Sequence, residues 1–270
     1  MFLLCGAAAV DSSFAESTVK SANVTAVLVS EASAIQPGKP FTVALQMKMA
    51  PGWHIYWKNP GDSGRPTQVV WTLPDSFKAS ELQWPTPART IDGGLALYGY
   101  EHQATFLTDI TPSPSLPPGK FTVAANVTWL ECKNVCIPGK ASLDLTLPAA
   151  TTTAARPIPT AEKAAFTKAR AAMPQASSVL KGAAAVRGTQ FILKLSGLRT
   201  LAAPLEFFPD TANLIEPAAP QTVSRNGATW EIHAKRPTNA DALPEPLIGV
   251  LVSGTGTAKR SYKLIAHGAR

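Results

Sequence analysis

Residues 121–147, FTVAANVTWLECKNVCIPGKASLDLTL, are the stretch that decides the fold. Apolar side chains recur at every second position from Val123 to Trp129, and residues 141–147 alternate in the same way. A period of two is typical of a β-strand with one buried face. The sequence therefore predicts strands at residues 121–131 and 141–147, with Cys132 and Cys136 in the segment between them.

Similar short patterns extend over the rest of the chain, separated by turns that are rich in proline and glycine. The 24 prolines argue against a helical bundle, because proline interrupts helices and marks turns and strand ends. Further strands are predicted at residues 24–30, 41–49, 69–73, 104–110, 189–195, 205–208, 228–234, 247–252 and 262–266. We expect an all-β protein with two immunoglobulin-like antiparallel β-sandwich domains, joined by a linker and one short helix.

The boundary between these domains is predicted from composition. Residues 148–160, PAATTTAARPIPT, are typical of a linker. Residues 161–173 form the helix candidate, with Thr160 as N-cap and Pro174 as its end. We therefore expect a redox domain at 16–148, linker and helix at 149–175, and a second, smaller sandwich at 176–270.

The charge is distributed unevenly between the two halves. Residues 1–150 hold 10 Lys/Arg and 11 Asp/Glu, whereas residues 151–270 hold 15 and 7. A basic second domain is compatible with an acidic partner or anionic lipid, and equally with an ordinary solvated surface. No basic run is dense enough to indicate nucleic-acid binding.

The N-terminus is interpreted as a signal peptide. Residues 1–10 are apolar, and Ser13-Phe14-Ala15 fits a small-x-small cleavage site, so residues 1–15 would be removed on export. A basic n-region is missing, which predicts a truncated signal; the alternatives are a lipoprotein cysteine at Cys5 and a plain apolar terminus. We expect a protein of the Gram-negative periplasm that does not itself span the membrane, since no later stretch has the ~20 apolar residues required.

The spacing of Cys132 and Cys136 constrains the chain between them. A disulfide needs Cα atoms about 4.4–6.8 Å apart, whereas residues four apart in an extended strand are separated by ~13 Å. The chain must therefore fold back, either as a hairpin with residues 133–135 as its loop or as a helical turn. The preceding strand and an expected turn at Pro138-Gly139 favour the hairpin.

A bridge over so short a loop adds little stability, on the order of 2 kcal/mol. A reversible redox pair explains it better than a structural staple does. Lys133 would lower the pKa of a neighbouring thiol and Glu131 would oppose that effect. A minor structural disulfide and a metal pair remain the alternatives.

The metal alternative is a Cu(I) site. Met47 and Met49 share one strand face and His54 follows, so thioether, thiolate and imidazole ligands are available together with Cys132 and Cys136. Methionines on an alternating strand are more typical of a core. We expect no cofactor, and keep a periplasmic copper-binding or copper-tolerance module as the alternative function and a structural adaptor as the third.

Several motifs in one order resemble a known family. They are residues 52–64 (GWHIYWKNPGDSG), Trp84-Pro85, residues 98–101 (YGYE) and residues 129–138 (WLECKNVCIP). Together they resemble the N-terminal periplasmic domain of the DsbD family of thiol:disulfide interchange proteins, in its ScsB-type branch. Residues 187–266 resemble the second immunoglobulin-like domain of that branch less sharply.

The resemblance implies a thiol:disulfide oxidoreductase of the protein-disulfide reductase type. A separate membrane-embedded DsbD/ScsB-type donor would supply electrons, and periplasmic thioredoxin-like or disulfide isomerase proteins would receive them through a mixed disulfide. The family's later cysteine, here Cys136, would form that mixed disulfide, and Cys132 would resolve it.

The resemblance also implies a cap over the cysteines. The matching piece is Leu97-Tyr98-Gly99-Tyr100, followed by Glu101, and Tyr98 is the candidate shield. His54, Tyr56 and Trp57 would line the site. Two departures from the family's enteric member are its wider cysteine spacing and its Phe in place of Leu97. The family's transmembrane and terminal thioredoxin domains are not in this sequence.

Overall fold

The structure is a computed structural model that describes residues 16–150 and 162–269. The predicted signal peptide, Cys5 and the helix cap at Thr160 lie outside these residues. The first part contains β1 (Glu16–Lys20), β2 (Val24–Ser30), β3 (Phe41–Met49), β4 (His54–Gly61), β5 (Gln68–Thr72), β6 (Lys78–Ala79), β7 (Ala88–Asp92), β8 (Leu95–Glu101), β9 (Gln103–Thr111), β10 (Lys120–Cys132) and β11 (Cys136–Pro148). The second contains α1 (Lys163–Ala172), β12 (Lys181–Arg187), β13 (Gln190–Ser196), β14 (Leu205–Pro209), β15 (Thr222–Asn226), β16 (Thr229–Lys235), β17 (Leu247–Ser253), the 3₁₀ turn η1 (Gly256–Ala258) and β18 (Arg260–Gly268).

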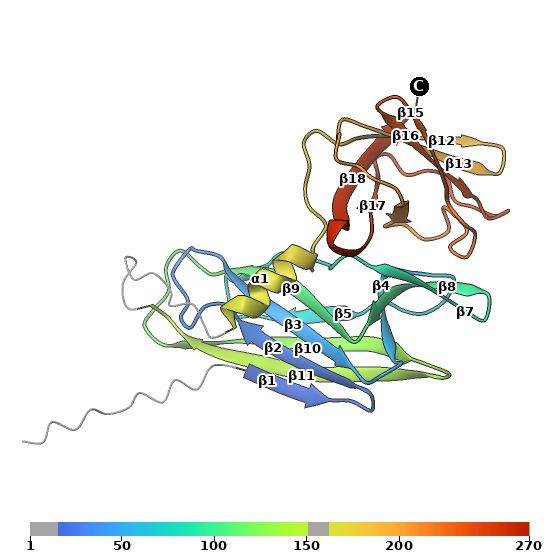
Figure 1. Cartoon of the computed structure of the whole chain (residues 1–270). Helices are drawn as coiled ribbons and strands as arrows, with labels where there is room; N and C mark the ends of the chain where they lie inside the picture. Colours follow the sequence, from blue (N-terminus) through green and yellow to red (C-terminus); the bar gives the residue numbers. More distant parts are fainter. Residues whose placement is uncertain (1–15, 151–161, 270) are drawn as a thin grey trace, which may run out of the picture.

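The first part of the chain forms two antiparallel sheets that enclose one core (Figure 1). One sheet has the order β1-β2-β3-β9-β6, and the other has the order β11-β10-β4-β8-β7, with β5 paired to β10. The predicted strands at 24–30 and 41–49 coincide with β2 and β3. The largely β, two-sheet expectation for this part is confirmed, while its immunoglobulin-like identity stays a prediction.

The long hairpin β10–β11 is the element that the alternating sequence predicts. Val123, Ala125, Val127 and Trp129 are buried in the core, and the residues that alternate with them face outward. The pairing is continuous from Lys120↔Pro148 to Cys132↔Cys136. The expected turn at Pro138-Gly139 is wrong, because both residues lie inside β11.

Gly139 is required at its position in β11 by its neighbour across the hairpin. It lies opposite Trp129, and a Cβ on it would come within 2.2 Å of the indole. The glycine that looked like a turn signal therefore makes room for a tryptophan.

The second part of the chain differs from the predicted sandwich. Its strands form one seven-stranded sheet, in the order β14-β17-β18-β12-β13-β16-β15, which curls around its own apolar cluster (Figure 1). One pair in it, β12 with β18, is parallel. Curling lets a single sheet enclose side chains such as Phe191, Phe207 and Leu251 without a facing second sheet.

Helix α1 lies on the outer face of the five-stranded sheet (Figure 1). Phe166 and Ala169 are buried there against Val29, Ala44 and Leu107. The helix begins after Glu162, which makes no side-chain cap. It ends at Ala172, shortly before Pro174, as the sequence predicts.

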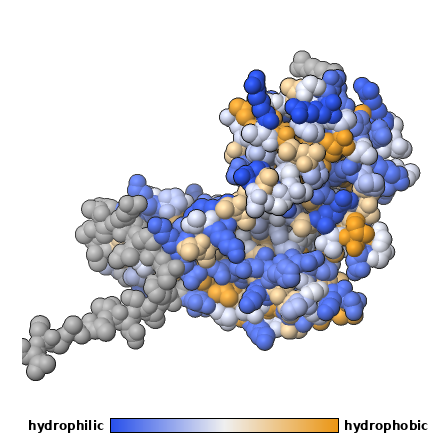
Figure 2. Space-filling model, in the orientation of Figure 1, coloured by the Kyte–Doolittle hydropathy of each residue, from blue (hydrophilic) through white to orange (hydrophobic). Residues whose placement is uncertain are grey.

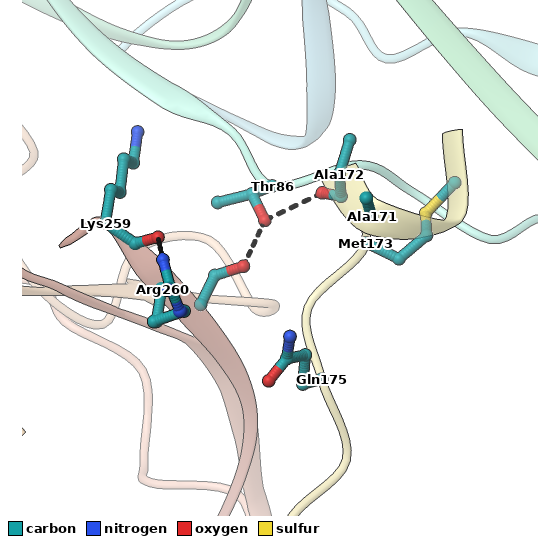
Figure 3. A pocket seen from close by; sticks show the side chains of 8 residues that line it. Thr86, Ala171, Ala172, Met173, Gln175, Lys259 and Arg260 are labelled. Carbon is teal, nitrogen blue, oxygen red and sulfur yellow. Dashed lines mark hydrogen bonds between the residues drawn. The ribbon is translucent and has the colours of Figure 1, made fainter. Parts of the chain in front are cut away.

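The two parts of the chain contact each other through both apolar and polar side chains. Phe208, Val250 and Val252 of the curled sheet belong to the core cluster of the first part. Near the end of α1, the Thr86 hydroxyl donates to Ala172 O at 3.0 Å and lies 2.5 Å from Ser261 Oγ (Figure 3). A cavity of about 440 Å³ lies here, and Met173, Gln175 and Arg260 also line it.

The face of the surface in view is mixed in polarity. Figure 2 shows hydrophobic residues scattered among hydrophilic ones rather than gathered into one patch. Within residues 16–150 and 162–269, no helix has the length and apolar character needed to cross a membrane.

Candidate redox site at the hairpin tip

Cys132 and Cys136 end the two strands of the β10–β11 hairpin. They are register partners, their Cα atoms are 4.1 Å apart, and a disulfide joins them. Lys133, Asn134 and Val135 form the loop, as the hairpin interpretation predicts, and no helical turn is present.

The two cysteines differ sharply in exposure. Cys132 is 1% exposed and packs against Tyr56, Leu97 and Leu130. Cys136 is exposed, and the neighbouring Val135 is 62% exposed. A second protein can therefore approach Cys136 but not Cys132.

Strand β4 supplies the polar groups beside the disulfide. His54 is the register partner of Cys132 on one side and of Glu101 on the other. Tyr56, two residues on, faces the same side of the sheet. Tyr56 Oη lies 3.2 Å from His54 Nε2 and 3.9 Å from Cys136 Sγ.

Burial sets the protonation of both side chains. Desolvation lowers the pKa of His54 below its usual value, partly offset by the carboxylates of Glu101 and Asp92. Desolvation raises the pKa of Tyr56. At neutral pH the site thus holds a neutral imidazole and a neutral phenol.

The loop at residues 61–67 packs against Tyr56 beside the disulfide. Its Asp62 exchanges two hydrogen bonds with the backbone of Ala96, at 2.9 and 2.7 Å. Gly64 lies on the Tyr56 ring, so that a Cβ there would be 2.2 Å from Tyr56 Cε1. Sequence reasoning missed this role, although Gly61, Asp62, Ser63, Gly64 and Pro66 are typical loop residues that could have indicated it.

The expected cap residues separate into two groups. Leu97 contacts Cys132, and Gly99 and Glu101 lie opposite Tyr56 and His54 on β8. The rings of Trp57 and Tyr98 instead point inward, where Phe208 lies 6.2 and 5.0 Å from them. Tyr100 is also buried in the core and donates to Pro85 O at 2.8 Å. The structure therefore places Tyr98, the candidate shield, at the domain junction.

The physical reason is the two-residue period of β8. Residues 97, 99 and 101 lie on the same face of the sheet as His54 and Tyr56, so residues 98 and 100 must face the core. The expected cap is a strand, and Cys132 is covered by Leu97, Tyr56 and Leu130.

The two residues expected to tune the thiolate point away from the sulfurs. Glu131 is 0% exposed on the inner face, where it accepts hydrogen bonds from Ser21 Oγ, Asn23 N and Trp129 Nε1 at 3.2–3.3 Å. Lys133 is exposed, and its Nζ donates to Pro51 O at 3.5 Å. Thiolate tuning by these residues stays a prediction.

Of the alternative copper ligands, the two methionines are not brought together with the cysteines. Met47 and Met49 are buried in the core between the sheets, whereas Cys132 belongs to a separate cluster. Over the described ranges, no group of three or more His, Cys, Asp or Glu is placed to hold a metal ion.

Comparison with known proteins gives the site a family. The family described as "Thiol:disulfide interchange protein DsbD, N-terminal" matches residues 24–148. The crystal structure of the N-terminal periplasmic domain of ScsB from Proteus mirabilis shares the fold, with a TM-score of 0.69 and 18% identity. That match covers 95% of this chain and 100% of the other. The reduced Neisseria meningitidis DsbD n-terminal domain matches at a TM-score of 0.28 and 14% identity, over 46% of this chain and 90% of that one.

No curated protein matches the sequence. The family match runs from β2 to the end of β11, so it contains the whole cysteine hairpin and the loop at residues 61–67. Residues 24–148, which carry the cysteine hairpin, therefore match the DsbD N-terminal family of thiol:disulfide interchange proteins.

Proposed function

We propose that this protein is a periplasmic thiol–disulfide electron carrier. It takes electrons from a membrane-embedded donor of the DsbD/ScsB type and passes them to thioredoxin-like or disulfide isomerase proteins. The observation that carries this proposal is a disulfide at a hairpin tip with one exposed and one buried cysteine. The family match and the periplasmic ScsB domain of the same fold support it.

The unequal exposure supports different steps for the two sulfurs. In the reduced protein, the Cys136 thiolate attacks a partner's disulfide, and one partner sulfur leaves with the electron pair. Cys132 Sγ then attacks Cys136 Sγ, which releases the partner as a dithiol and forms the Cys132–Cys136 disulfide. Two electrons thus pass to the partner for each cycle.

Single-cysteine variants test this assignment with the aromatic disulfide DTNB as probe. We expect reduced Cys132→Ala, which keeps Cys136, to form the mixed disulfide at least about tenfold faster than Cys136→Ala, because only Cys136 is exposed. Faster reaction of Cys136→Ala would reverse the roles. A wild-type reduction potential far below about −300 mV would instead identify a structural disulfide and overturn the carrier function.

A further inference from the structure

A chain of three polar atoms runs along the redox face of β4. Tyr56 Oη stands between His54 Nε2, at 3.2 Å, and Cys136 Sγ, at 3.9 Å. Both side chains project from the same strand face, because they are two residues apart. The second distance is short enough for a weak hydrogen bond to sulfur.

We propose that Tyr56 and His54 form a proton relay for Cys136. Tyr56 is the catalytic residue that touches the reacting sulfur, and His54 is the positioning residue that holds the proton. The inference rests on the carrier function proposed above and names the groups that activate its attacking thiol.

The relay balances protons and electrons in the first exchange step. The Cys136 thiol gives its proton to Tyr56 Oη while the phenol gives its own proton to His54 Nε2. The thiolate then attacks the partner's disulfide: the Cys136–partner S–S bond forms and the partner's S–S bond breaks. The leaving sulfur takes the electron pair, and the proton returns to it along the same path.

No other charged side chain near the cysteines competes for this role. Glu131 points into the core and Lys133 toward the carbonyl of Pro51. Glu101 faces His54 from β8 rather than the sulfurs. Among the described residues, Tyr56 is the one whose side chain makes a polar contact with either sulfur.

Packing holds the phenol in place for this task. Tyr56 is buried, and Gly64 lies directly on its ring. The His54 ring meets it edge-on, with centroids 5.2 Å apart and an interplanar angle of 81°. Fixed donors and acceptors need no reorganisation during proton transfer.

The environment of His54 also suits a proton acceptor. Burial lowers its pKa below the usual value, so the imidazole is neutral and able to accept at neutral pH. Glu101 from β8 and Asp92 at the end of β7 act in the opposite direction and stabilise the protonated ring once it forms. Cys132 from β10 is its other register partner.

The pH dependence follows with a definite sign. The relay works when His54 is neutral, so the exchange rate should fall as the pH drops through a value below the ordinary histidine pKa. Well above the pKa of the thiol, solvent ionises Cys136 and the relay no longer contributes. A defect in the relay is therefore visible near neutral pH and absent in strong alkali.

The test uses the full reduced chain with oxidised glutathione from pH 5 to 10. We expect Tyr56→Phe and His54→Gln to lower the rate at pH 7 by roughly ten- to a hundredfold, to remove the low-pH inflection, and to reach the wild-type rate near pH 10. His102→Gln, at an exposed turn, and Tyr262→Phe, in the second domain, are controls that should keep the wild-type profile.

Each outcome distinguishes the relay from the carrier function. Wild-type rates at pH 7 in both Tyr56→Phe and His54→Gln would overturn the relay and leave the carrier intact. An equal loss at all pH values, including pH 10, would indicate a structural role and would also overturn it. If the wild-type dithiol fails to exchange with glutathione at any pH, the carrier function itself fails.

Discussion

Glu131 illustrates how two sequence neighbours on a strand can face different parts of the molecule. Its carboxylate is fully buried beside Cys132 in sequence, yet it lies on the opposite face of β10. There it accepts hydrogen bonds from Ser21 and Asn23 of the β1–β2 turn and from the Trp129 indole. It joins the first hairpin to the base of the redox hairpin.

We predict that Glu131→Ala destabilises the protein by about 2–3 kcal/mol, because buried donors that lose their acceptor pay a desolvation cost. Urea unfolding of the reduced and oxidised protein measures this free energy. The exposed Glu101→Ala is the matched control and should change the free energy of unfolding by less than about 0.5 kcal/mol. Equal effects of the two substitutions would show that the buried contacts contribute nothing.

For single residues, features set by local sequence patterns could be predicted, whereas contacts that depend on the pairing of distant strands could not. The cysteines and their hairpin follow from spacing and from flanking alternation. The contact of Tyr56 with Cys136 depends on how β4 and β10 are registered, and that pairing joins residues some 80 positions apart. The motif indicates that the strand containing Tyr98 lies near the cysteines. It does not indicate which face of that strand the Tyr98 side chain occupies.

At the scale of elements, the loop at residues 61–67 links the redox face to the beginning of β8, at Ala96. It is tied down by the Asp62–Ala96 hydrogen bonds and pressed on Tyr56 by Gly64, whose φ of +107° disfavours any side chain. Its composition predicts a loop, but composition does not indicate what a loop covers. The position of Tyr56 therefore depends on a residue that has no side chain.

We predict that Gly64→Ala displaces the Tyr56 ring and lowers the exchange rate at pH 7 to that of Tyr56→Phe, since its Cβ would clash with Tyr56 Cε1. Gly93→Ala is the control: its φ is also positive, at +56°, but no atom lies within 4 Å of the added Cβ. Both substitutions should lower the free energy of unfolding by about 1 kcal/mol, because alanine is strained at a positive φ. Exchange kinetics with glutathione measure the difference, and an unchanged rate in Gly64→Ala would refute it.

At the scale of the whole molecule, the two domains are joined through the strand that carries the site. Tyr56 of β4 faces the cysteines, while the next residue, Trp57, packs on Phe208 of the curled sheet. Lys58 forms an ion pair with Asp210, and the Asn59 amide donates to Pro209 O at 2.8 Å. The second domain therefore supports β4 directly behind the redox face.

The sequence predicted a largely β chain with one short helix, because alternation is a local signal, while the domain bounds stay a prediction. It did not predict that the second domain would be one curled sheet, since closure depends on pairings such as β12 with β18, about 80 residues apart. Nor could it assign Phe207 and Phe208 to different cores. Both are apolar, and only the face of β14 that each occupies separates them.

Substitutions of Phe207 and Phe208 test how the two parts of the molecule are held together. Phe208→Ala removes the ring that packs on Trp57 and Tyr98, whereas Phe207→Ala removes one that stacks on Phe191 inside the second domain. Each substitution loses about 3–5 kcal/mol of packing, but in different places.

We expect Phe208→Ala to keep both domains folded while they separate. This separation would be seen as a larger radius of gyration in small-angle scattering and as two thermal transitions in calorimetry. Phe207→Ala should unfold the second domain alone at lower temperature. If Phe208→Ala has the same radius of gyration and the same number of thermal transitions as the wild type, the polar bonds of Lys58 and Asn59 suffice to hold the two parts together, and the aromatic contact is not what fixes β4.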